Sequence, residues 1–348
     1  MMRVLYHLTV LPPKMPEAEA MSQEIGALRA HFGGELVYLN PNQYSPIYVP
    51  RLLFGLHLLK QLRAKEADHQ IHQLYNPDPF PFPILRLLRR PAIYTLSCGV
   101  GPRRPNVRFL NSLAAVTVYD ERSFKRLRAW GVGNVALVRP GIDASRFTCS
   151  PLPLGSLRSL RSEVRLMVGS SPWSQAQFRT KGVDALLAAA QRAPELRLTF
   201  LWRGVLAEEM ERRVRERGLG KQVVVLNRRV DVNQVLANVH ASITLAADPA
   251  IVRSYPHSLM DSLAAGKPVL VSRAIPMSDH VEQAGCGVVV DSVTPAGVLA
   301  AIETLIQEYD KLQKAAQDVG QRDFTQQAMI DSYAQVYEHV LELTERRP

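Results

Sequence analysis

The residues best suited to chemistry lie in one block, residues 253–270, where a polar loop precedes a short helical stretch and a buried strand. The helix is expected to begin near His257 or Ser258 and to end at Gly266, so the backbone of His257, Ser258 and Leu259 lies at its start. The backbone N–H groups and the positive end of the helix dipole at such a start attract anions. The block therefore indicates a binding site for a phosphate or a diphosphate.

Asp261 follows Ser258 by three residues, which places both side chains on nearly the same face of that helix. A carboxylate in this position can accept two hydrogen bonds from a ribose diol, as acidic residues of dinucleotide sites do. The alternative interpretation of Asp261 is an ordinary solvated helix acid. With the helix start beside it, the pattern indicates a nucleotide.

Elements able to position such a site run through the whole chain, because short apolar runs alternate with amphipathic helical stretches. This alternation predicts parallel strands with helical crossovers, hence an α/β class with sheets covered on both faces. The expected strands are residues 4–10, 35–39, 92–96, 116–119, 135–139, 164–168, 197–201, 223–226, 241–245, 268–271 and 287–290. The expected helices include residues 18–31, 121–130, 183–191, 207–217, 232–239 and 258–265.

The 348 residues are too many for one small module and predict two domains. A segment rich in Pro, Gly and Ser, residues 149–156, is the candidate linker. We expect an N-terminal acceptor-side α/β domain over residues 1–150 and a C-terminal nucleotide-sugar-binding α/β domain over 151–320. Residues 321–348 are expected to form a C-terminal helix, whose apolar stripe serves the core or packs back on the first domain. Two doubly wound domains of this kind face a cleft, with ligands at the carboxyl ends of the strands.

The charge is unevenly distributed, since residues 1–150 hold 19 basic and 10 acidic side chains, whereas the remainder holds 23 and 22. A basic half suggests an anionic partner such as a phosphorylated acceptor or a membrane surface, or simply a basic soluble surface. Nucleic acid is not expected as a partner, because no recognised binding module occurs. The three cysteines lack paired spacing, which fits a reducing cytoplasm, and no apolar run approaches the roughly 20 residues of a membrane span.

The block at 253–270 also resembles the signature of the group-one glycosyltransferases, glycosyltransferase family 4, which have the two-domain GT-B fold. In that signature two Glu residues, separated by seven others, precede a small-residue helix end and Gly-x-Pro-Val. The segment Thr180-Lys181-Gly182-Val183-Asp184 is similar to the family's Lys-Gly segment at a helix start. Residues 139–147, with Pro140-Gly141-Ile142-Asp143, look like the element that closes the family's first domain.

The resemblance implies that Lys181, together with Arg179, neutralises the diphosphate of a nucleotide-sugar donor, with Gly182 opening the next helix. A cation beside a helix start would also stabilise the charge that grows on a departing nucleoside diphosphate. By the same resemblance Val230 lies near the base through backbone contacts, although a simple strand-exit residue is an equal interpretation. The family also implies that transfer retains the configuration of the sugar.

Several family positions differ in this sequence. Arg253 replaces the first Glu of the signature, Asp261 is shorter than the second, and Ser97 stands where the family has a His. Arg253 could pair with the carboxylate of a uronic acid donor; the alternatives are a lost site or a different loop in which Asp248 supplies the acid. The turn at residues 14–18 lacks the family's glycines.

These observations predict a retaining hexosyltransferase that moves a sugar from a nucleoside-diphosphate sugar to a glycan, lipid or small-molecule acceptor. Lys181, Arg179, Arg253 and Ser97 are the expected catalytic residues. No cofactor and no metal ion are expected, because the sequence holds no Asp-x-Asp pair. We expect a cytoplasmic protein with peripheral contact at the inner face of the membrane through its basic first domain. The alternative is a catalytically degenerate GT-B protein that acts as a binding or partner subunit.

Overall fold

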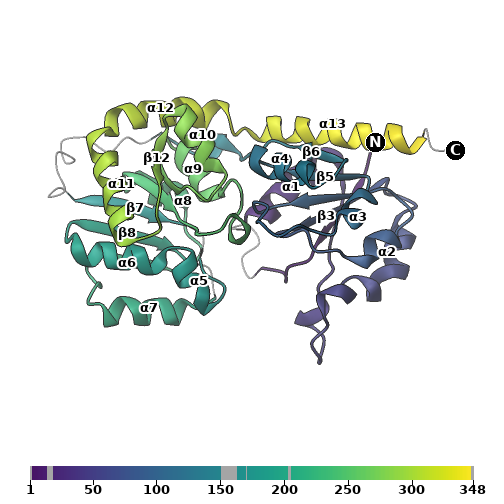
Figure 1. Ribbon diagram of the computed structural model, residues 1–348, viewed down its shortest axis with the longest axis horizontal. Helices are drawn as coiled ribbons and strands as arrows, with labels where there is room; N and C mark the ends of the chain where they lie inside the picture. The colour runs from purple at the N-terminus through teal and green to yellow at the C-terminus, as the bar shows by residue number, and fades with distance from the viewer. Residues whose placement is uncertain (1, 14–18, 150–162, 170, 203–204, 346–348) are drawn as a thin grey trace. The chain divides into compact units, whose positions relative to one another are not determined.

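The computed structural model describes residues 2–13, 19–149, 163–169, 171–202 and 205–345. The chain divides into two compact units: unit 1 comprises Met1–Gly141 and Gln326–Pro348, and unit 2 comprises Ile142–Thr325. Each unit has a parallel sheet, six-stranded in its described part, with helices against it (Figure 1). The predicted α/β class with doubly wound parallel sheets is confirmed.

The sheet of unit 1 has the strand order β2-β1-β3-β4-β5-β6, and all of its pairings are parallel. The chain moves from β1 to one side and then returns to place β3 on the other, so the strand order reverses between β1 and β3. The strands are β1 Val4–Leu8, β2 Gly34–Tyr38, β3 Ile71–Asn76, β4 Ala92–Leu96, β5 Ala115–Val118 and β6 Val135–Leu137.

Helices α1, α3 and α4 of unit 1 begin where a side chain accepts from a free N–H group of the first turn. Asp120 accepts from the Ser123 N–H at 2.7 Å at the start of α4, and Glu19 accepts from the Ser22 N–H at 2.7 Å at the start of α1. The helices are α1 Ala20–Phe32, α2 Leu59–Lys65, α3 Val107–Asn111, α4 Glu121–Ala129 and α13 Gln326–Glu345. Before β4 the described part of this unit also includes the short 3-10 turns η2 Pro41–Gln43, η3 Arg51–Leu53, η4 Leu56–Leu58 and η5 Pro83–Arg86.

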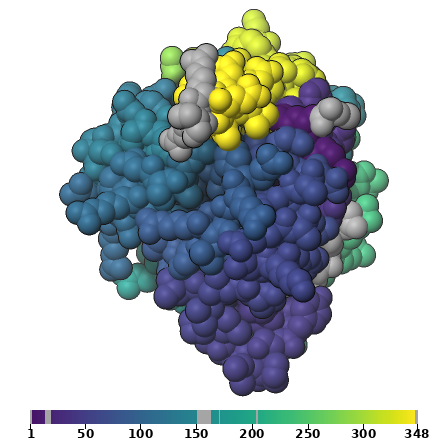
Figure 2. Space-filling view, turned by 90° about the vertical axis from the view of Figure 1, so that its right-hand side faces the viewer, coloured from purple at the N-terminus to yellow at the C-terminus, as the bar shows by residue number. Residues whose placement is uncertain are grey.

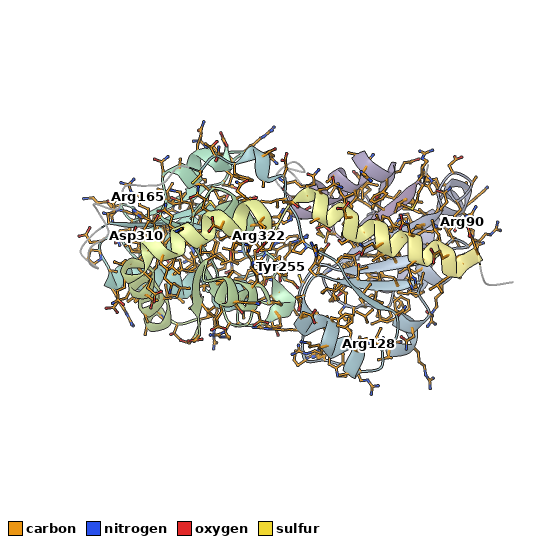
Figure 3. The ribbon with its side chains drawn as sticks, turned by 90° about the horizontal axis from the view of Figure 1, so that it is seen from above. Arg90, Arg128, Arg165, Tyr255, Asp310 and Arg322 are labelled. Atoms are coloured by element: carbon orange, nitrogen blue, oxygen red, sulfur yellow. The ribbon has the colours of Figure 1, made fainter. Side chains whose placement is uncertain are left out.

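Helix α13 joins unit 1 through buried polar contacts rather than through apolar ones alone. The Tyr333 hydroxyl donates to Glu24 at 3.1 Å and lies 2.9 Å from the Tyr119 hydroxyl, which also donates to Glu24. The Tyr337 hydroxyl donates to Gln73 in β3. Seen from above, α13 runs across the strands of this unit (Figure 3). The last helix therefore completes the first unit.

The sheet of unit 2 has the strand order β12-β11-β10-β7-β8-β9, again with parallel pairings only. Its strands are β7 Val164–Val168, β8 Leu196–Leu201, β9 Val223–Leu226, β10 Ala241–Thr244, β11 Val269–Ser272 and β12 Gly287–Val290. Its helices are α5 Gln175–Thr180, α6 Val183–Arg192, α7 Ala207–Glu216, α8 Val232–Ala237, α9 His257–Ala264, α10 Met277–Ala284, α11 Pro295–Gln307 and α12 Tyr309–Arg322, with 3-10 turns at Ala144–Arg146 (η6) and Pro249–Ile251 (η8).

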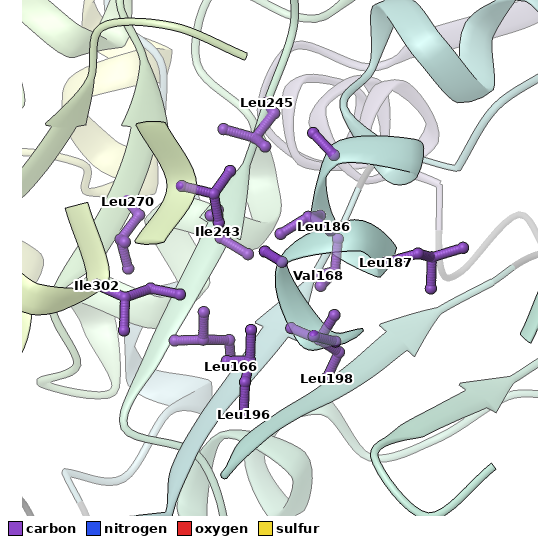
Figure 4. Close-up of a cluster of buried hydrophobic side chains, with 14 of the residues drawn as sticks. Leu166, Val168, Leu186, Leu187, Leu196, Leu198, Ile243, Leu245, Leu270 and Ile302 are labelled. Atoms are coloured by element: carbon purple, nitrogen blue, oxygen red, sulfur yellow. The ribbon is translucent and has the colours of Figure 1, made fainter. Parts of the chain in front are cut away.

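The main core of unit 2 lies between one face of this sheet and helices α6, α7 and α11. Alternate strand residues such as Leu166, Leu198 and Ile243 point to this face and are fully or almost fully buried (Figure 4). Leu186 of α6 and Ile302 of α11 pack against them. Burial of these aliphatic side chains makes the sheet a rigid platform, because interiors of this density resist displacement.

Most predicted elements occur within two residues of their expected bounds, but unit 1 differs from the sequence pattern in two places. The leucine spacing of residues 51–65 predicts one amphipathic helix, whereas Gly55, with φ +80°, separates η3 from η4 and α2. Strand β3 was not predicted at all. The boundaries between the two units fall after Gly141 and Thr325, whereas the sequence predicted domain boundaries after residues 150 and 320. The candidate linker beyond Cys149 and the turn at 14–18 lie outside the described residues. Among the helices described, none is both long and apolar enough to cross a membrane.

Candidate functional site

The strand order of unit 2 reverses between β7 and β10, which are adjacent parallel strands. In open α/β sheets, ligands bind outside the carboxyl ends of the strands at such a reversal. Gly169 follows β7, Thr244 ends β10, and Ser258 of α9 reaches both: its Oγ lies 3.3 Å from the Thr244 Oγ1. A methyl group at Gly169 would overlap the Ser258 side chain, with its carbon 2.5 Å from the Ser258 Cβ. The start of α9 is thus packed directly onto the reversal point.

Lys181 lies at the same edge of the sheet, at the carboxyl end of α5. Its side chain is buried, with 7% of its surface exposed, and its Nζ donates to the Ser171 carbonyl oxygen at 3.1 Å. Ser171 belongs to the segment that leads out of β7. A buried ammonium in a fixed position beside a strand end interacts with an anion more strongly than a solvated one, because less water screens it.

Gly182 connects Lys181 to α6 and has a left-handed backbone conformation, with φ +70°. A methyl group there would lie 2.7 Å from the Cβ of Leu245 and 2.9 Å from the Cγ1 of Val293. The neighbouring Thr180 carbonyl accepts from the Ala247 N–H at 2.7 Å. The α5–α6 junction is therefore fixed against the end of β10, and only glycine fits at its centre.

Helix α9 begins at His257, after Pro256, where the sequence predicted a start near His257 or Ser258. Pro256, the N-cap residue, has no side-chain group that could cap this start. His257, Ser258 and Asp261 are half-buried, whereas Leu259 is fully buried in the core. Asp261 lies within α9, one turn beyond the helix start. The positive end of the α9 dipole therefore lies at the reversal point, near the strand-end loop that Lys181 contacts.

Arg179 lies on the exposed side of α5 and lines an open cavity of about 720 Å³ at the carboxyl ends of β10 and β11. The opposite wall carries Arg273, which pairs with Glu282 at 2.7 Å and with Asp291 at 3.0 Å. These hydrogen bonds to Glu282 and Asp291 raise the pKa of the Arg273 guanidinium above its ordinary value. Arg273 is thus already neutralised by carboxylates.

Val230 is half-buried in the loop between β9 and α8. It lines a second open cavity, of about 520 Å³, between α8 and the sheet. The lining includes four arginines: Arg165, Arg197, Arg228 and Arg229. Arg165 and Arg197 lie 2.5 and 3.5 Å from carboxylate oxygens of Glu163. The position of Val230 beside a cavity at a strand end fits contact with a base. Its packing against the small apolar cluster that includes Leu236 also fits the simple strand-exit interpretation.

The remaining predicted residues are not all brought together. Arg253 is half-buried in the loop between η8 and α9, four residues before the helix start. The Asp248 carboxylate caps η8 by accepting from the Ala250 N–H at 2.8 Å. Ser97 is buried at the end of β4 in unit 1, where its N–H donates to the Asn76 carbonyl at 3.0 Å. No cluster of three or more potential metal ligands occurs among the described residues.

Sequence reasoning missed Gly169, Thr244 and Ser171, which hold the predicted residues in place. A signal was present for Gly169, because a glycine directly after a buried strand often marks a close approach of another element. The contact of Thr244 with Ser258 depends on how β10 lies beside β7, which the sequence does not reveal.

This fold defines a protein with two Rossmann-like units, and the predicted diphosphate residues lie at the strand-order reversal of its second sheet. Residues 174–322 match the family model for glycosyl transferases group 1. Unit 2 therefore carries a group 1 glycosyltransferase domain, and the chain is a glycosyltransferase. No curated protein matches the chain significantly in sequence.

Solved structures confirm the fold over the whole chain. Anabaena HepE in complex with UDP and glucose is 16% identical, with 97% of this chain and 100% of that chain covered and a TM-score of 0.71. Sucrose-phosphate synthase from Thermosynechococcus elongatus is 14% identical, with 99% and 100% covered and a TM-score of 0.72. WaaG, a glycosyltransferase involved in lipopolysaccharide biosynthesis, is 13% identical, with 96% and 99% covered and a TM-score of 0.67. At these identities the likeness establishes the GT-B fold.

Proposed function

We propose that the chain transfers a sugar, with retention of configuration, from a nucleoside-diphosphate sugar to a glycan, lipid or small-molecule acceptor. The observation that carries the proposal is the buried Lys181 ammonium beside the strand end at which α9 begins. A UDP-sugar is the donor to test first, since the similar HepE structures contain UDP, UDP with glucose, and UDP-glucose.

In this proposal the chain acts by binding and electrostatics. Lys181 and the start of α9 hold the diphosphate, and their positive charge stabilises the negative charge that develops on it as the bond to the sugar breaks. Asp261 holds the ribose, the backbone at Val230 lies near the base, and Arg179 supplies further charge. No metal ion is needed for this step, because side-chain and helix charges neutralise the diphosphate. Chelation with EDTA should leave the turnover rate unchanged.

Arg253 is the residue that we assign to sugar choice. Its guanidinium can form a bidentate pair with the carboxylate of a uronic acid. The location proposed for the protein is the cytoplasm, with unit 1 in peripheral contact with the inner face of a membrane. The excess of nine basic over acidic side chains in residues 1–150 supports that contact.

Calorimetric titration with UDP, GDP and ADP, and with UDP-glucose and UDP-glucuronic acid, tests the donor site. We expect saturable binding of one diphosphate, weakened on the order of tenfold or more in Lys181→Ala. Lys221→Ala removes the same charge from an exposed turn of unit 2 and should bind as the wild type does. Equal weakening in both variants would refute the assigned role of Lys181. Absence of binding to every diphosphate would favour a non-catalytic partner subunit.

A further inference from the structure

Unit 1 carries a short segment whose large apolar side chains face solvent. Residues 41–53, which we term the apolar loop, run from η2 to η3 and project from the body of the unit (Figures 1 and 2). Tyr44, Ile47 and Tyr48 are 83%, 74% and 76% exposed, and Leu52 and Leu53 are 51% and 45% exposed. Single exposed apolar residues are common, but five within ten positions form a patch that signals an interaction site.

The apolar loop has a defined shape. The Asn42 side chain accepts from the Val49 N–H at 2.7 Å and donates to the Val49 carbonyl at 3.0 Å, which closes the loop across its base. The Ser45 hydroxyl donates to the Ile47 carbonyl at 2.6 Å inside the closed loop. The apolar side chains are therefore held outward by internal hydrogen bonds, with little freedom to fold back onto the protein.

The loop is also fixed to the sheet of unit 1. Arg51, at its end, donates to both carboxylate oxygens of Asp78 at 3.0 and 2.7 Å. The Arg51 guanidinium carbon lies 4.4 Å from the centre of the Phe80 ring, a cation–π distance. Phe54, which follows directly, is buried. These contacts fix the end of the apolar loop to the body of unit 1.

Basic side chains outnumber acidic ones in the segments at the base of the apolar loop, where η3 packs against η5. Residues 41–65 contain four basic and no acidic side chains, and residues 86–90 contain three arginines. The two stretches meet where Arg63 donates to the Leu87 carbonyl at 3.1 and 2.9 Å, beside the exposed Leu87 side chain. Lys60 and Arg89 are exposed on them. The same unit thus exposes an apolar loop and, beyond its base, several cations.

We propose that the apolar loop inserts into the headgroup region of an anionic lipid bilayer and docks unit 1 on the membrane. This inference rests on the membrane contact proposed above, but it is independent of sugar transfer. The order of polarity fits a bilayer: Ile47 enters the acyl boundary, Tyr44 and Tyr48 keep their hydroxyls among the headgroups, and the lysine and arginines face lipid phosphates. The charge complementarity selects an anionic surface over a neutral one.

Co-sedimentation of the full chain with vesicles of phosphatidylcholine, with and without phosphatidylglycerol, tests the proposal. We expect binding to the anionic vesicles that weakens about tenfold or more in the triple variant Tyr44→Ser, Ile47→Ser, Tyr48→Ser. The double variant Lys60→Gln, Arg89→Gln should also bind anionic vesicles more weakly than the wild type. This loss should be larger at low salt than at high salt, because salt screens the attraction between these cations and the lipid phosphates. The matched control is Leu137→Ser, Val205→Ser, Leu343→Ser, which alters side chains exposed by 43%, 48% and 44% elsewhere.

Vesicle binding by the triple loop variant at wild-type strength would overturn the proposal, as would a wild type that binds no vesicles. A wild-type dimer that the loop variant dissociates, without vesicle binding, would identify the loop as a protein interface and overturn it too. Titration with UDP in each variant separates this result from the donor site: loop variants should bind the diphosphate as the wild type does. If the wild type binds anionic vesicles but no diphosphate, the result counts against sugar transfer and leaves the docking proposal intact.

Discussion

Replacing Gly182 with alanine tests whether the α5–α6 junction holds Lys181 in place. The added methyl group meets two obstacles. The backbone at Gly182 is left-handed, with φ +70°, and the new carbon would lie 2.7 Å from the Cβ and Cδ1 of Leu245. Leu245 is a buried residue of the main core of unit 2 and cannot move aside freely. The junction must shift, and the shift displaces Lys181, its immediate neighbour.

The two costs can be separated by a matched variant. A left-handed conformation costs a residue with a Cβ atom about 1–2 kcal/mol, and forcing a methyl group into a packed core costs about 1–3 kcal/mol. Gly218 has nearly the same conformation, with φ +68°, and nothing lies within 4 Å of a methyl group placed on it. Gly218→Ala therefore carries only the first cost, and Gly182→Ala carries both.

Thermal unfolding and calorimetry with UDP form the assay. Gly182→Ala should be less stable than Gly218→Ala by about 1–3 kcal/mol, which corresponds to a melting temperature lower by roughly 2–12 °C for a unit of this size. UDP affinity should fall in Gly182→Ala and stay at the wild-type value in Gly218→Ala. Equal melting temperatures for the two variants would show that Leu245 yields without cost and would refute the reasoning. An unchanged UDP affinity in Gly182→Ala would show that Lys181 does not depend on this junction.

Two further predictions concern buried polar side chains. Burial, with smaller contributions from nearby Lys267 and Arg165, lowers the pKa of His240 from 6.5 to about 4, so the unfolded chain binds this proton below pH 6.5 and the folded chain only near pH 4. The free energy of unfolding should therefore fall as the pH decreases from 6.5 to 4, by up to about 1.4 kcal/mol per pH unit. Denaturant titrations across this range should show a shallower fall for His240→Asn than for the wild type. Parallel profiles for the two proteins would contradict this reasoning. Tyr333→Phe removes one of two tyrosine hydroxyls that donate to buried Glu24 and should lower the stability of unit 1 by about 1–3 kcal/mol in urea unfolding, whereas exposed Tyr44→Phe should not.

The sequence predicted those strands whose residues are nearly all apolar, because burial on both faces leaves a continuous pattern. It missed β3, Ile71-His72-Gln73-Leu74-Tyr75-Asn76, because each face of this strand carries polar as well as apolar side chains. The polar side chains there are satisfied by distant partners: His7 lies 2.9 Å from His72, and Tyr337, 264 positions away, donates to Gln73. Such pairing is invisible to local periodicity.

The candidate site shows the same division. Residues within one local motif, such as Ser258 and Gly182, are found at a helix start and at a helix junction as predicted. The contacts that place these motifs side by side, such as Thr244 with Ser258, depend on the parallel pairing of β7 with β10. This pairing joins segments more than 70 residues apart, and it follows from the order of the whole sheet rather than from any local pattern. Gly55 shows the opposite error, since its left-handed backbone interrupts a stretch whose leucine spacing predicted a continuous helix.

The position of α13 has a consequence for co-translational folding. Unit 2 is one continuous segment, so all of its strands and helices are available once Thr325 has emerged. The sheet of unit 1 is translated before unit 2, but the partners of Glu24 and Gln73 on α13 are translated after it. Synthesis from the N-terminus therefore allows unit 2 to fold before unit 1 is complete. Glu24 and Gln73 lack their α13 partners until that helix has been translated.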